Sequence, residues 1–112
     1  MAKYEAFVVG SIEAVMEHLH TDIMDAGATM NLVDECFETV GASKVAVKVY
    51  DKYFMRNGNR ASLSVTAVES DGKVFVSAIG AGGGQGILFN FSLGAEGEMV
   101  DVVAESLRRF AK

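Results

Sequence analysis

The stretch from Lys44 to Ile79 constrains the fold more than any other part of the chain, because apolar and polar residues alternate in it across three successive elements. In the first of these elements, from Lys44 to Tyr53, valines fall on one parity and lysines on the other. A period of two is typical of a strand with one buried and one exposed face. The stretch therefore predicts a β-meander whose apolar face must be covered by other elements.

Two turns set the register of this meander. Asp71-Gly72 suits a two-residue type I′ turn, which pairs Ala67 with Val76. At the earlier turn, a two-residue loop at Asn57-Gly58 would place valines opposite serines, whereas a three-residue loop over 56–58 keeps the apolar residues on one face. We therefore predict a bulged turn with Gly58 in the left-handed conformation. The predicted inner face consists of Val45, Val47, Val49, Ala61, Leu63, Val65, Ala67, Val74, Val76 and Ala78.

The segments outside the meander predict further strands and two helices. Apolar residues recur at helical spacing over 12–26, after the potential N-cap Ser11, and again over 99–110. We expect a first strand over 3–9, in which Phe7 and Val9 interrupt the alternation, an acidic edge strand over 29–39, and another strand over 87–92. The order is β-α-β-β-β-β-β-α. This predicts one α+β domain over 1–112, with a mostly antiparallel sheet and both helices packed on one face.

Composition excludes several classes of protein. The chain has 112 residues, of which 50% are hydrophobic, which suits one folded domain and argues against disorder. A net charge of −5 argues against a nucleic-acid partner. The lysines of the meander do not make a nucleic-acid surface more plausible. In either plausible register of the preceding strand, Asp34 or Glu35 falls opposite Lys48 and can form an ion pair with it. No apolar run is long enough to span a bilayer, and the lone Cys36 fits a reducing compartment. We expect a soluble, cytoplasmic protein that does not bind membranes.

The glycine-rich segment Gly80, Ala81, Gly82, Gly83, Gly84, Gln85 and Gly86 is a candidate ligand or anion loop. Glycines let backbone N–H groups approach a phosphate, but a phosphate cradle is normally followed by the N-terminus of a helix. Here an Ile-Leu-Phe run with strand character follows, and no P-loop lysine is present. A simple crossing between two strands is the favoured interpretation.

Histidines and the cysteine offer weak evidence for chemistry. His18 and His20 are two residues apart on a predicted helix, so their side chains diverge and cannot chelate one metal together. A nucleophile pair of Cys36 with a histidine, oriented by Glu35 or Asp34, is conceivable, but nothing in the sequence brings these residues together. We predict neither a metal site nor a cofactor.

The predicted outer face of the meander is less polar than a solvated face should be. Tyr50, Val68, Phe75 and Ile79 fall on it. Exposed apolar clusters of this kind usually bind a partner or a ligand. These residues are therefore a candidate homo-oligomer interface, with a dimer as the simplest form.

Several segments resemble a family of short bacterial proteins of unknown function: 1–5, 47–53, 59–63 and 75–79 with the following glycine loop. The resemblance covers nearly the whole chain. It implies a stand-alone bacterial cytoplasmic protein and supplies no catalytic motif.

We therefore expect a non-enzymatic binding or self-associating module, and an enzyme is the least favoured alternative. In one version the outer face joins two copies. In another, a cavity between sheet and helices carries a small apolar ligand. That second version is excluded if the cavity is filled by core side chains, namely Met16, Leu19, Met99 and Leu107.

Overall fold

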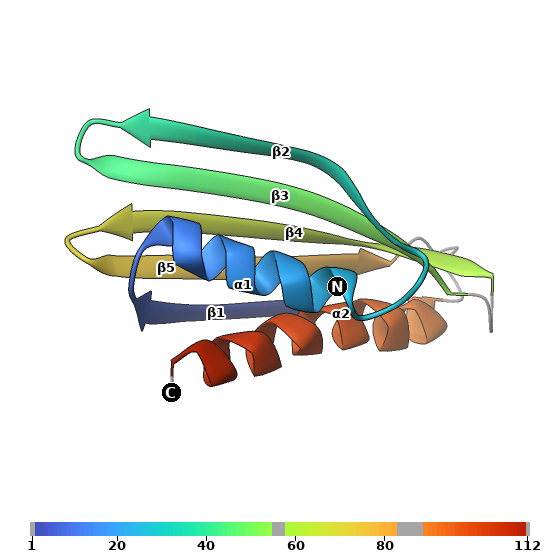
Figure 1. The fold of residues 1–112 in the computed structure, drawn as a ribbon. Coiled ribbons are helices and arrows are strands. Elements are labelled where there is room, and N and C mark those ends of the chain that lie inside the picture. The colour runs from blue at the N-terminus through green and yellow to red at the C-terminus, as the bar shows by residue number, and fades with distance from the viewer. Residues whose placement is uncertain (1, 55–57, 83–88, 112) are drawn as a thin grey trace.

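The computed structural model describes residues 2–54, 58–82 and 89–111, and within 89–96 only the course of the backbone. Its elements are β1 (Ala2–Val9), α1 (Ile12–Met24), β2 (Met30–Val40), β3 (Ser43–Phe54), β4 (Asn59–Ser70), β5 (Lys73–Gly82) and α2 (Phe89–Phe110). The strands form one antiparallel sheet in the order β1-β5-β4-β3-β2. Both helices lie on the same face of this sheet (Figure 1). The predicted α+β class with two helices on one face is confirmed.

The first helix follows the local signals of its sequence. The Ser11 side chain accepts a hydrogen bond from the N–H of Ala14 at 3.1 Å, which caps the free backbone donors at the start of α1. Its apolar stripe is buried against the sheet and α2, through Ile12, Val15, Met16, Leu19 and Ile23. Burial of this stripe anchors α1 to the sheet.

The turn between β4 and β5 is also as predicted. Asp71 and Gly72 have φ angles of 56° and 76°, the left-handed values that a type I′ turn requires. Ala67 pairs with Val76, and the apolar parity continues unbroken from one strand to the next. Both residues are fully buried beneath the helices.

The register between β3 and β4 differs from the prediction. Phe54 pairs with Asn59, so odd-numbered residues of β3 lie opposite even-numbered residues of β4. Gly58 has the expected left-handed φ of 71°, whereas residues 55–57 of the predicted bulged turn lie outside the described residues. The pairing nevertheless implies a turn one residue longer than the 56–58 loop. The assumption that all apolar residues share one parity was therefore wrong.

This register reverses the two faces of β3. The helix side of the strand carries Ala46, Tyr50 and Phe54, which are at most 5% exposed. Val45, Val47 and Val49 point to the other side of the sheet, so they do not belong to the predicted inner face. Burial of two aromatic side chains removes more apolar surface from water than burial of the valines, which suit either face of a strand. The remaining members of the predicted inner face, on β4 and β5, are buried as expected.

The predicted strand over 87–92 is not formed in the part that the structure describes. Phe89 to Ser92 belong to α2, which has 22 residues and continues through Gly94 and Gly97 to Phe110. An alternating pattern over a few residues does not separate a strand from a buried helix, and length decides between them. The sheet consequently has five strands.

Candidate functional site

An apolar row crosses the face of the sheet that carries no helix. Phe7 of β1 pairs with Phe75 of β5, Phe75 with Val68 of β4, and Val68 with Val45 of β3. The two phenylalanine rings are in contact, with 5.1 Å between their centroids. Phe7 is 71% exposed, although aromatic side chains gain much from burial.

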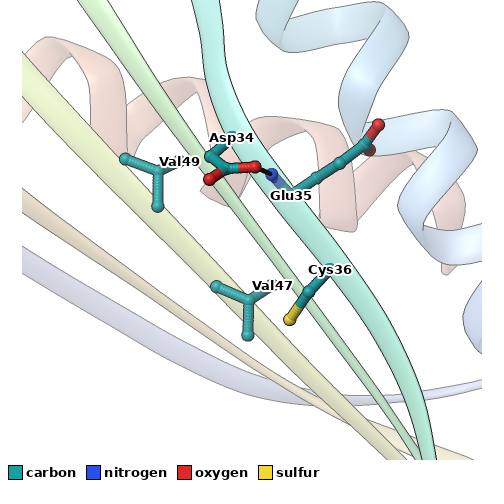
Figure 2. A pocket seen from close by; sticks show the side chains of 5 residues that line it. All are labelled: Asp34, Glu35, Cys36, Val47 and Val49. Carbon is teal, nitrogen blue, oxygen red and sulfur yellow. Dashed lines mark hydrogen bonds between the residues drawn. The ribbon is translucent and has the colours of Figure 1, made fainter.

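A second apolar line runs along β3 on the same face. It begins at Val45, the end of the row, and continues through Val47 and Val49. In Figure 2, Cys36 lies beside Val47 and Asp34 beside Val49, while Glu35 points away from them. A shallow hollow of about 190 Å³ lies here, and the residues that line it are Asp34, Glu35, Cys36, Val47 and Val49. The row and this line together form what we call the helix-free patch: Phe7, Phe75, Val68, Val45, Val47 and Val49.

The predicted interface residues divide between the two faces of the sheet. Val68 and Phe75 belong to the helix-free patch, and Ile79, which is 40% exposed, lies on the same face. Tyr50 lies on the helix side and is 1% exposed, so its assignment to the outer face was wrong. Phe7 was not predicted as an interface residue, although its interruption of the β1 alternation was the signal for an exposed apolar side chain.

The Tyr50 hydroxyl forms a hydrogen bond with Nδ1 of His20 at a distance of 2.8 Å. Burial raises the pKa of Tyr50 above its usual range, and the negative charge of Glu35 raises it further. The phenol is therefore neutral at physiological pH. A neutral phenol can either donate to Nδ1 or accept from it, so the contact suits either state of that nitrogen.

The conceivable cysteine–histidine pair is not formed. Cys36 is exposed on the helix-free face, whereas His20 lies on the helix side of the sheet. His18 instead contacts α2, with its Nε2 3.0 Å from the backbone oxygen of Ser106 and 3.3 Å from Asp22. Within the described residues, no group of three histidine, cysteine or acidic side chains is placed to hold a metal ion.

Part of the glycine-rich candidate loop belongs to the sheet. Gly80 and Gly82 are residues of β5 and pair with Leu63 and Ala61 of β4. Gly80 is buried and also pairs with Ala2 of β1. Gly83, Gly84, Gln85 and Gly86 lie outside the described residues. Anion binding by the loop stays a prediction.

A groove on the helix side was not predicted from the sequence. It lies between α1 and the β2 edge, has a volume of about 370 Å³, and is lined by Glu13, Met16, Glu17, His20, Phe37 and Lys48. The long helix α2 packs on β5, β1 and β4, and only the shorter α1 reaches β3 and β2, so the helix layer is thin at this edge of the sheet (Figure 1). The one available signal was Phe37, an aromatic residue close to the acidic residues Glu35 and Glu38.

The lysines of β3 point toward this helix side. Lys44 bonds to Glu13 of α1 at 3.1 Å, and Lys48 pairs with Glu35 on β2. The cross-strand position of Glu35 opposite Lys48 is one of the two registers predicted. The Lys48–Glu35 pair is the expected cross-strand ion pair, whereas Lys52 donates to the backbone oxygen of Ala26 at 3.3 Å.

The fold and these surfaces define a small α+β domain with a single antiparallel sheet, which is covered by helices on one face and carries an apolar patch on the other. The chain belongs to the family of unknown function DUF6054, whose model matches residues 1–111. No curated protein matches the chain.

One solved structure similar to this chain is the crystal structure of TTHA0849 from Thermus thermophilus. Its sequence is 13% identical, the match covers 96% of this chain and 94% of that chain, and the TM-score is 0.36.

Among the described residues, neither helix is both long and apolar enough to cross a membrane.

Proposed function

We propose that this protein is a non-enzymatic, self-associating module in which the helix-free patch packs against the same patch of a second copy. The observation that carries the proposal is the exposure of Phe7, which is 71% accessible at the end of an apolar row that crosses the sheet. Contiguous apolar surface of this kind normally marks an interaction site. Two sheets can pack face to face through such surfaces at a distance of about 10 Å.

The distribution of charge supports a second copy as the partner. Lys3 and Glu5 lie next to the patch on β1, 3.9 Å apart, so each copy presents both signs of charge there. At the β1 side of the patch a two-fold related copy therefore meets no strong field of a single sign, whereas the β2 side carries the acidic residues Asp34 and Glu38 opposite Val49 and Val45. The patch itself contains no charged side chain.

The size of the face sets the expected strength of association. Five strands about 4.8 Å apart and a β1 strand of 8 residues give a face of roughly 20 by 26 Å, or about 500 Å² in projection. Stable complexes bury about 600–1,000 Å² per partner. We therefore expect a dimer that dissociates on dilution.

Sedimentation velocity over a concentration series tests the proposal with a matched pair of variants. Phe7→Glu places a charge in the patch, and Phe37→Glu makes the same change on another exposed phenylalanine (49% accessible) on the opposite side of the sheet. The wild-type protein and Phe37→Glu should both dimerise, and Phe7→Glu should remain monomeric. A wild-type monomer at high concentration, or equal dimerisation of both variants, would contradict the proposal.

The alternative of an apolar-ligand carrier has less support. The side chains whose packing would exclude it, Met16, Leu19, Met99 and Leu107, are at most 2% exposed and belong to the core cluster between helices and sheet. Native mass spectrometry reports subunit number and co-purified ligand together. A mass that exceeds the chain by a small apolar molecule would favour the carrier.

A further inference from the structure

The groove between α1 and β2 has the dimensions of a small-molecule site. Its volume of about 370 Å³ falls within the usual range for ligand pockets. Along α1 it extends from Glu13 to His20, which is about 10 Å at 1.5 Å per residue. A groove of this length is too short for a partner helix of several turns. It suits a compact molecule.

Apolar and polar groups in the groove are separated. Met16, which is 2% exposed, closes the floor of the groove, and Phe37 on the β2 wall is 49% exposed, so an apolar body can rest against the Phe37 ring. The His20 ring is held by its hydrogen bond to Tyr50. This leaves one defined polar group beside the apolar surface.

The charges of the groove favour a cation. Two of the charged lining residues are already engaged by groups outside the lining, Glu13 by Lys44 and Lys48 by Glu35. Glu17 adds a further carboxylate to the lining, and it is exposed. In the part of the chain that the structure describes, Glu17 makes no ion pair. Glu17 is therefore the carboxylate of the lining that no lysine neutralises.

We propose that this groove binds a small organic cation, an amine on an aromatic or branched aliphatic body. The ammonium group lies against Glu17, and the body packs against Phe37. An aromatic ring beside the ammonium adds cation–π attraction. The site is on the opposite side of the sheet from the helix-free patch, so it does not depend on self-association.

Three probes with matched bodies test this assignment: phenethylamine, 2-phenylethanol and 3-phenylpropionate. Each is titrated into ¹⁵N-labelled protein, and amide shifts are followed by NMR. Phenethylamine should shift amides of α1 and β2 around Glu17 and Phe37 in a saturable way. The alcohol should bind more weakly, and the carboxylate most weakly.

Variants identify the group responsible. Glu17→Gln should weaken phenethylamine binding by up to about fivefold, the range for one exposed ion pair, and Glu17→Lys should reverse the preference toward the carboxylate. Glu105→Gln, an exposed change on α2, should have no effect. The proposal is overturned if the amine shifts no groove amides, if the carboxylate binds as tightly as the amine, or if Glu17→Lys leaves the ranking unchanged.

Discussion

The contact between the two helices allows a quantitative prediction about Asp22. The hydroxyl of Ser106, which is fully buried in α2, donates a hydrogen bond to the Asp22 carboxylate. Arg109 also donates to this carboxylate, and Nε2 of His18 lies 3.3 Å from it. Asp22→Asn keeps an acceptor for Ser106 but removes the charge that all three partners face.

The expected loss of stability follows from the type of each contact. Replacing a charged acceptor by a neutral one costs about 1 kcal/mol for the buried Ser106 bond. The pair with Arg109, whose side chain is 57% exposed, contributes less than about 1 kcal/mol. The free energy of unfolding should therefore fall by about 1–2 kcal/mol at neutral pH, and the melting temperature by about 4–8 °C.

The loss should depend on pH, because the pKa of Asp22 lies below its usual value of 3.8 in the folded protein. The hydrogen bond from Ser106 is the main cause, and the charges of Arg109 and His18 add to it. A lowered folded-state pKa stabilises the protein above the unfolded-state pKa, and this stabilisation is lost as the pH falls through the folded value. The difference between wild type and Asp22→Asn should be full above about pH 5 and should close in acid.

Thermal unfolding followed by circular dichroism between pH 2 and 7 measures this difference. Glu105→Gln serves as the control, because Glu105 forms only an exposed pair with Arg108 at 3.6 Å, and it should shift the melting temperature little at any pH. A gap between wild type and Asp22→Asn that is equally large at low and neutral pH would refute the electrostatic account. So would the absence of any gap.

Two further predictions test the register and a turn. In the Phe7→Glu background, which keeps the sheet face uncovered, Val65→Ala should cost about 2–3 kcal/mol because Val65 is fully buried, while Val47→Ala on the other face should cost less than about 1 kcal/mol. Urea unfolding measures both, and equal losses would argue against the register described. Gly72→Ala should cost about 1–2 kcal/mol in the same assay because Gly72 has a φ of 76°, although its Cβ would meet open space. An unchanged midpoint would show that the turn accommodates alanine without strain.

The candidate surfaces could be predicted only in part. Val68, Phe75 and Ile79 were placed on the helix-free face because the β4–β5 turn sets their parity, and that turn is encoded by two adjacent residues. Tyr50 was misplaced because its face depends on the length of the turn between β3 and β4. The α1–β2 groove depends on how far the helix layer extends across the sheet, which no local pattern indicates.

The amino-acid sequence by itself determined the features that depend on neighbouring residues: the Ser11 cap and stripe of α1, the Asp71-Gly72 turn, and the α+β class. Tertiary structure decided which parity of β3 faces the helices and that Phe89 to Ser92 join a helix. The physical reason is that valines tolerate either face of a strand, and a short apolar run suits strand or helix. Only the burial of Tyr50 and Phe54 against distant elements separates the two parities of β3.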